Sequence, residues 1–260
     1  MDRIAEIICA DCLDVLASIP PDSIDLIVVD PPYYKMSSVW WDKQWKTEQE
    51  YLAWCSLWLK ESSRVLKPNG SFYCWGCVGK HHNHAFFHLI DLAETYFIFK
   101  NFITWQKQRG YGTQKNWMFT REELVYMVKD DADTTFHPQY TDVPRTVNMH
   151  YADKEKQEKY EKSLKSVNKR VTNVWTDIKE PNISWNKKEV TTDHPTPKPV
   201  KAMERIVKAS SNEGDVVLDF FGGTGATAVA CANLNRQYIV SDFVSEYIEE
   251  TKRRMIDVLL

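Results

Sequence analysis

The sequence lacks the features expected of a membrane or secreted protein. None of its apolar runs approaches the roughly 18 residues that a helix needs to cross a bilayer. The first residues include Asp2, Arg3 and Glu6, a charge pattern unlike that of a secretory signal peptide. We therefore expect the six cysteines to be reduced thiols in a cytoplasmic protein.

The chain also lacks a strong excess of charge. Its 33 basic and 36 acidic side chains give a net charge of −3, so a nucleic-acid partner would have to be recognised through local basic patches. The sequence has no internal repeat and no low-complexity segment. Its 260 residues, 43% of them hydrophobic, allow one large domain or one domain with an insertion.

Strand-like and helix-like segments alternate along most of the chain. Strands are predicted at residues 4–9, 24–29, 72–75, 96–105, 124–129, 216–221 and 237–241. Helices are predicted at residues 12–19, 47–66, 81–94 and 197–207, from about residue 226, and at 244–259. This alternation predicts an α/β fold with a doubly wound, mostly parallel sheet.

The alternation stops between residues 130 and 190. Within that stretch, residues 151–189 hold ten Lys or Arg and seven Asp or Glu, a local excess of positive charge without a clear period. The sequence therefore predicts an insertion at 130–190 that separates two halves of one domain, residues 1–129 and 191–260.

The most informative stretch is Asp30-Pro31-Pro32-Tyr33, which follows the apolar run at 24–29. Two prolines end the strand and hold the backbone extended, at the sheet edge where α/β folds bind ligands. This corner offers a carboxylate, carbonyl oxygens and an aromatic ring, which suit a planar ring that carries an amino group. A strand-ending turn with a hydrogen-bonded aspartate would explain the same residues without a function.

A second informative stretch lies near the carboxyl end. The apolar run at 216–221 leads into Gly222-Gly223-Thr224-Gly225, where glycines let a ligand approach the backbone. The next strand ends at Asp242, which could accept hydrogen bonds from ribose hydroxyls. The glycine spacing also fits a nicotinamide dehydrogenase, but that fold usually opens with its glycine turn. Here only about eighteen residues follow Asp242, which argues against a dehydrogenase.

Together the two stretches resemble the S-adenosylmethionine-dependent DNA amino-methyltransferases of the β arrangement. In that arrangement the Asp-Pro-Pro-Tyr half precedes the target-recognition insertion, and the glycine-turn half follows it. Three smaller stretches are close to further family motifs: Cys9-Ala10-Asp11-Cys12, residues 64–70, and His194-Pro195-Thr196-Pro197-Lys198-Pro199. Ala10 stands where the family usually has glycine, and beside the glycine turn Phe220 and Ala226 replace the frequent proline and threonine without changing the glycine spacing. The resemblance implies a Rossmann-like methyltransferase fold in circularly permuted order.

The resemblance also implies roles for individual residues. Asp30, Pro31, Pro32 and Tyr33 would be catalytic: Asp30 and the Pro31 carbonyl would accept the amino hydrogens of a flipped-out base, and Tyr33 would stack on it. S-adenosylmethionine would be held by Asp11, Cys12, Asp30, Thr196, Lys198, Asp219, Phe221, Gly223, Thr224, Gly225 and Asp242. For Asp11 and Asp219, capping the following helix or turn is an alternative. Both stretches would have to line one shared cleft.

Double-stranded DNA is the expected partner, and the family suggests a homodimer and a cognate restriction endonuclease as further ones. Residues 100–121 hold five Lys or Arg, no acid, and several aromatic residues that could wedge or stack. A second basic face lies in the insertion, and either face could simply be solvated. The expected DNA contacts are Lys107, Arg109, Lys115, Arg121, Lys165, Lys169 and Arg170.

The sequence narrows the choice of target base only in part. Within the family, Asp at the first position of the corner favours adenine N6 over cytosine N4. A cytosine carbon-5 enzyme would need a Pro-Cys pair, which the sequence lacks. A methyltransferase for RNA or for a protein glutamine, and an inactive DNA-binding relative, are further alternatives.

Two other patterns carry less weight. Cys74 and Cys77, followed by histidines at 81, 82 and 84, have the spacing of a zinc or redox site. Zinc would need four converging ligands, and Cys74 lies on a predicted strand, so no metal is expected. The tryptophans at 40, 41 and 45, in a loop expected at 35–46, could form a lid or a dimer contact.

Overall fold

The computed structural model describes residues 4–36, 39–79, 83–112, 114–131, 133–144, 155, 166–181 and 194–259. The chain forms two compact units, each with its own sheet. The larger comprises Met1–His137 and Asn173–Leu260, and the smaller is Pro138–Thr172. The smaller unit lies within the predicted insertion at 130–190, although the flanks of that insertion belong to the larger unit.

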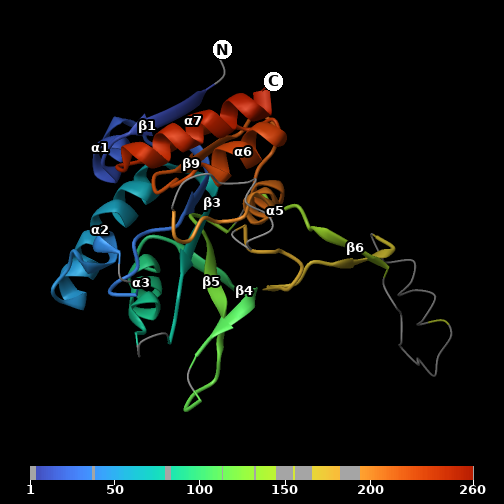
Figure 1. Cartoon of the computed structure of the whole chain (residues 1–260). Helices are drawn as coiled ribbons and strands as arrows, with labels where there is room; N and C mark the ends of the chain where they lie inside the picture. Colours follow the sequence, from blue (N-terminus) through green and yellow to red (C-terminus); the bar gives the residue numbers. More distant parts are fainter. Residues whose placement is uncertain are drawn as a thin grey trace. The chain divides into compact units, whose positions relative to one another are not determined.

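The larger unit is built on an eight-stranded sheet in the order β1-β10-β9-β2-β3-β5-β4-β8 (Figure 1). Among these strands, β5 alone runs antiparallel to its neighbours. The strands are β1 (Ala5–Cys9), β2 (Ile24–Val29), β3 (Leu66–Gly76), β4 (Ile98–Tyr111), β5 (Phe119–Val128), β8 (Val174–Trp175), β9 (Val216–Asp219) and β10 (Gln237–Asp242). The predicted mostly parallel sheet is thus confirmed.

The helices form two groups that cover opposite faces of this sheet (Figure 1). One group is α1 (Cys12–Ser18), α2 (Glu48–Val65) and α3 (Ala85–Ala93); the other is α5 (Val200–Ser210), α6 (Ala226–Asn233) and α7 (Ser245–Leu259). A short 3-10 helix, η1, spans Trp40–Lys43. No helix among the described residues has both the length and the apolar character that a membrane crossing requires.

Three predicted element boundaries need correction. Helix α2 begins with a capping box of Thr47 and Glu50, but it ends at Val65 rather than at 66. Leu66, included in the helical pattern, opens β3 instead, because Pro68 disfavours helical backbone just before it. Helix α3 begins at Ala85 rather than at 81, since the Asn83 side chain accepts the Ala85 N–H and competes with helix formation.

The largest difference is the length of the β4–β5 hairpin. The prediction ended the first strand at residue 105 and began the second at 124, whereas β4 continues to Tyr111 and β5 starts at Phe119. Beyond the sheet, and within the part of the chain that the structure describes, these strands pair only with each other. A two-stranded ribbon buries little on either face, so its sequence has no alternation of polar and apolar residues to reveal it.

The sheet order places the two informative stretches side by side. β2 pairs in parallel with both β3 and β9, so the corner after β2 and the turn after β9 leave the same sheet edge at neighbouring positions. The residues of β2 are almost fully buried, which fixes that edge rigidly.

The smaller unit contains β6 (Tyr140–Pro144) and β7 (Asn168–Arg170), which form an antiparallel pair. Lys169 and Arg170, two of the predicted DNA contacts, are exposed on β7. Lys165, a third, lies outside the described residues.

Candidate active site

A cavity of about 390 Å³ opens at the carboxyl edge of the sheet. Its walls include the corner at 30–33, the glycine turn at 222–224 and the segment 194–198. The predicted meeting of the first two stretches in one cleft is therefore confirmed. The volume lies in the range of sites that bind small molecules.

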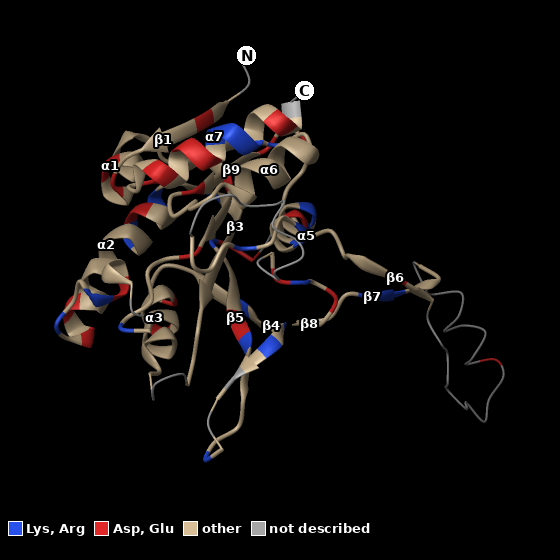
Figure 2. Cartoon of the chain, viewed as in Figure 1, with Lys and Arg blue, Asp and Glu red and all other residues tan. Residues whose placement is uncertain are grey.

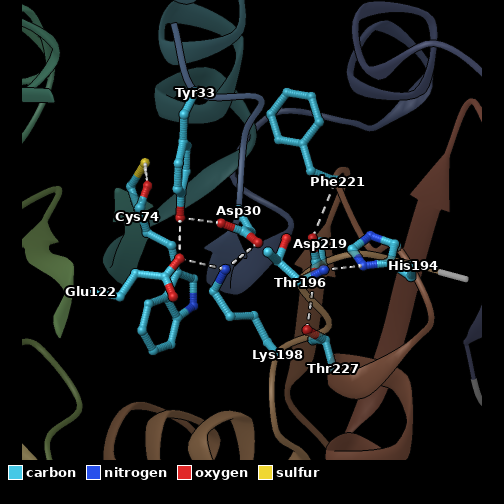
Figure 3. Close-up of polar contacts among 12 residues, drawn as sticks. Asp30, Tyr33, Cys74, Glu122, His194, Thr196, Lys198, Asp219, Phe221 and Thr227 are labelled. Carbon is cyan, nitrogen blue, oxygen red and sulfur yellow. Dashed lines mark hydrogen bonds and ion pairs between the residues drawn. The ribbon is translucent and has the colours of Figure 1, made fainter. Parts of the chain in front are cut away.

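Asp30 stands at the centre of a buried hydrogen-bond network (Figure 3). Its Oδ1 accepts a hydrogen bond from the Tyr33 hydroxyl at 2.6 Å, and its Oδ2 pairs with the Lys198 ammonium. The Tyr33 backbone N–H donates to Asp42 Oδ1 at 2.9 Å, so the segment 30–33 is also held by a side chain of η1. The Asp30 carboxylate is thus oriented on both oxygens and faces the cavity.

Glu122 is a site residue that the sequence prediction missed. It lies on β5, is 5% exposed, and lines the cavity. Its Oε1 is 3.0 Å from Lys198 Nζ and 2.9 Å from the Tyr33 hydroxyl, while its Oε2 is 2.7 Å from Lys107 Nζ. A glutamate beside a strongly apolar strand segment was the available signal, because glutamate is almost never fully buried without a partner.

The two carboxylates have opposite pKa shifts. Burial would raise the pKa of Glu122, but the ammonium groups of Lys198 and Lys107 lower it to about 2. The pKa of Asp30 is raised, because burial and the charge of Glu122 together outweigh the lowering effect of the Lys198 ammonium. Lys198 is itself buried, yet the two acids raise its pKa above the usual value. Asp30 is therefore the first of the two acids to take up a proton.

The glycine turn is held by two aspartates. Asp219 accepts the Phe221 N–H at 3.1 Å and the Thr227 hydroxyl at 2.5 Å, and burial raises its pKa to about 7. Asp242 accepts the Gly223 N–H at 3.0 Å and the Val244 N–H at 2.9 Å. Both carboxylates also line the cavity. The capping expected as an alternative for Asp219 is present, alongside its place in the cavity wall.

Gly225 tests how strongly the turn depends on glycine. Its φ is +79°, and a Cβ atom there would come within 2.5 Å of Thr251 Cγ2. We expect Gly225→Ala to lower the free energy of unfolding by about 1–3 kcal/mol, measured by urea unfolding. Gly214→Ala is the matched control, because Gly214 has φ +86° with open space around it. Equal losses in both variants would show that the contact with Thr251 adds nothing.

The tryptophans at 40, 41 and 45 have different surroundings. Trp41 lines the cavity, and its ring centre lies 6.4 Å from that of His194. Burial, followed by the charge of Lys198, lowers the pKa of His194 to about 4, so this side chain is neutral at pH 7. Trp40 is 59% exposed. Trp45 is partly buried and packs against Tyr51 and Trp54 at the margin of the hydrophobic core instead.

Most predicted site residues of the larger unit reach the cavity, and four of its described ones lie elsewhere. Thr196, Lys198, Phe221, Gly223, Thr224, Lys107, Arg109 and Arg121 contribute to its walls. Asp11 instead caps α1 by accepting the Leu13 N–H at 2.8 Å, and Cys12 is buried in the hydrophobic core. Gly225 directly precedes α6 and is not part of the cavity wall. Lys115 lies near the tip of the β4–β5 hairpin, also outside the cavity wall.

The cysteine-histidine pattern is spread over separate places. Cys74 is buried on β3, where burial raises the pKa of its thiol, and Cys77 lines the cavity. His81 and His82 lie outside the described residues. Among the side chains that the structure describes, no group of three or more potential ligands could hold a metal.

The family model for N6_N4_Mtase, described as DNA methylase, matches residues 24–253. The chain belongs to this DNA methylase family. It is 31% identical to the type II methyltransferase M1.MboII of Moraxella bovis over 92% of both chains. It is also 31% identical to the DNA adenine methyltransferase YhdJ of Escherichia coli, over 96% of this chain and 82% of the relative.

Solved structures support the fold of this DNA methylase. The cytosine-N4-specific PvuII DNA methyltransferase superposes with a TM-score of 0.67 at 17% identity, covering 99% of this chain and 94% of the other. The protein TTHA0409 of Thermus thermophilus, complexed with S-adenosyl-L-methionine, superposes with a TM-score of 0.64 at 21% identity, covering 98% of this chain and 94% of the other. Both likenesses show a common Rossmann-like architecture.

Proposed function

We propose that this DNA methylase transfers a methyl group from S-adenosylmethionine to the exocyclic N6 of an adenine flipped out of double-stranded DNA. The observation that carries the proposal is the position of Asp30 and Tyr33 in the same cavity as the glycine turn. A hydrogen-bond acceptor for an amino group and a backbone turn suited to a cofactor thus face one space.

The residues around the glycine turn fit S-adenosylmethionine. Gly223 has φ +49°, and a Cβ there would come within 3.3 Å of His194 Nε2. Because glycine has no Cβ, the backbone at this position stays accessible to a ligand. Asp242 accepts backbone N–H groups on both oxygens and also lines the cavity, where its carboxylate could accept a ribose hydroxyl. Phe221, Gly223, Thr224 and Thr196 would surround the methionine part. Asp11 and Cys12 would contribute indirectly, by holding α1 near the sheet edge.

In the proposed reaction the residues of the corner position the target and polarise it. Asp30 and the Pro31 carbonyl would accept the two amino hydrogens, which draws the nitrogen lone pair out of ring conjugation. Bound S-adenosylmethionine supplies a methyl group whose bond to sulfur breaks with its electron pair left on sulfur. The target nitrogen forms the new bond to carbon, becomes positively charged and then loses one proton to water.

One experiment tests the reaction and the base together. The protein is incubated with unmethylated plasmid and labelled S-adenosylmethionine, the DNA is digested to nucleosides, and modified positions are mapped by sequencing. We expect N6-methyladenine at one short sequence. N4-methylcytosine would overturn the adenine assignment only, whereas unlabelled DNA would overturn the proposed function. The resulting map also supplies the recognition site, while a homodimer and a cognate endonuclease stay predictions.

The β4–β5 hairpin is the part of the larger unit best suited to contact DNA. Its base carries Arg109 and Arg121 at the cavity wall, and Figure 2 shows basic residues along β4 and at the hairpin tip. Trp117 is 90% exposed and Met118 is 63% exposed. Basic residues can neutralise phosphates, and an exposed aromatic ring can stack on bases.

We expect Trp117→Ala to weaken binding to duplex DNA about tenfold, because loss of one stacking contact costs roughly 1–3 kcal/mol. The measurement is fluorescence anisotropy with a labelled duplex. Leu57→Ala serves as the control, since Leu57 is a 53% exposed apolar residue on α2, away from the hairpin. A similar loss of affinity in both variants would contradict a specific role for the hairpin tip.

A further inference from the structure

We propose that Glu122 is a positioning residue for methyl transfer: it binds the Lys198 ammonium so that the charge of Asp30 stays available to the target amino group. This inference rests on the proposed function and concerns the same site. It assigns a role to β5, which carries neither of the two informative stretches.

The geometry shows that Lys198 serves two acids at once. The lysine is 7% exposed, and its Nζ lies between Asp30 Oδ2 and Glu122 Oε1 (Figure 3). The Tyr33 hydroxyl reaches the same two carboxylates, at 2.6 Å and 2.9 Å. A hydroxyl has one proton, so it can donate to only one of them at a time. Lys198 and Tyr33 can therefore shift towards Glu122 when Asp30 accepts a substrate.

Lys107 is the second ammonium group of the network around Asp30 and Glu122. It pairs with the second oxygen of Glu122 at 2.7 Å, so the network contains two carboxylates and two ammonium groups. The methyl transfer brings a positive charge onto the target nitrogen, next to Asp30. Without the charge of Glu122, the groups around the target nitrogen would carry an excess positive charge during methyl transfer. In a buried site this excess opposes the positive charge that develops on the nitrogen.

The surroundings of Asp30 allow the direction of a pH effect to be stated. The ionisable groups that face it are Tyr33 on its own corner, Cys74 on β3, Glu122 on β5, Lys198 before α5, and Asp219 at the end of β9. The charge of Glu122 raises the pKa of Asp30, and the charge of Lys198 lowers it. Loss of the glutamate should therefore let Asp30 hold its charge to lower pH, and loss of the lysine should do the reverse.

The test compares Glu122→Gln, Lys198→Gln and Glu123→Gln with the unaltered enzyme. Glu123 is the matched control, because it is the next residue on β5 and is fully buried, but it pairs with Arg121 at 3.0 Å, does not line the cavity and is not among the groups that shift the pKa of Asp30. Single-turnover methylation is measured across a pH series at saturating cofactor, on a duplex carrying the mapped recognition site. Binding of S-adenosylhomocysteine is measured by calorimetry for each variant, which checks that the folded site is intact.

We expect Glu122→Gln to lower the transfer rate at least about tenfold with cofactor binding within threefold, as the loss of one charge-assisted contact implies. Its acid limb should move to lower pH, that of Lys198→Gln to higher pH, and that of Glu123→Gln should not move. A slower Glu122→Gln with an unmoved acid limb would overturn the inference and leave the proposed function intact. An unaltered enzyme that labels no DNA would overturn the proposed function itself.

Discussion

Asp30→Ala is expected to lower the transfer rate at least about a hundredfold while cofactor affinity changes by no more than several-fold. The carboxylate orients and polarises the target amino group, whereas the proposed cofactor contacts come mainly from the turn after β9. Lys198 keeps Glu122 as a partner at 3.0 Å, so the variant should fold. Single-turnover methylation and calorimetric binding of S-adenosylhomocysteine give the two quantities.

Asp91→Ala is the control for this experiment, because Asp91 is exposed on α3. It should methylate at the rate of the unaltered enzyme. Near-normal transfer by Asp30→Ala would contradict the proposed mechanism, and an equal loss of rate and of cofactor affinity would indicate that Asp30 chiefly holds the cofactor.

Lys198→Met should produce the largest loss of stability. It removes the ammonium between two buried acids, and an uncompensated buried charge of this kind costs about 3–5 kcal/mol. Lys252→Met, which breaks an exposed pair with Glu249 on α7, should cost less than about 1 kcal/mol. Urea unfolding of both variants measures the difference.

The cost of Lys198→Met should also depend on pH. In the unaltered protein the pKa of Glu122 is lowered to about 2, so its stabilising effect is present above its ordinary value of 4.5 and is lost as the pH falls towards 2. Without Lys198, burial raises the pKa of both acids, and the folded variant loses stability as the pH rises. The gap between the two proteins should therefore be larger at about pH 7.5 than at about pH 4. An equal gap at both pH values would contradict this account.

The parts of the site that the sequence predicted share one property. Asp30 directly follows β2, and Gly223 lies in the turn that follows β9, so the local pattern marks both residues and their place at the sheet edge. Their meeting in one cavity follows from parallel neighbours, which a βαβ alternation already implies.

Glu122 and His194 were missed for a different reason. Glu122 belongs to the one antiparallel strand of the sheet, and its role depends on β5 lying beside β3, a pairing that alternation does not predict. His194 was noted only as part of a motif, although it stacks on Trp41 from a segment about 150 residues away. Contacts made by side chains across the sheet depend on strand order, and a single sequence carries little information on that order.

The position of β1 has a consequence for how the chain is made. β1 lies at one end of the sheet order and pairs with β10, more than 200 residues later. During synthesis β1 thus lacks its partner in the sheet until residues 237–242 have left the ribosome. An unpaired strand can associate with other chains, and contacts this distant in sequence form slowly. The exposed charge of Glu6 on β1 disfavours such association during synthesis.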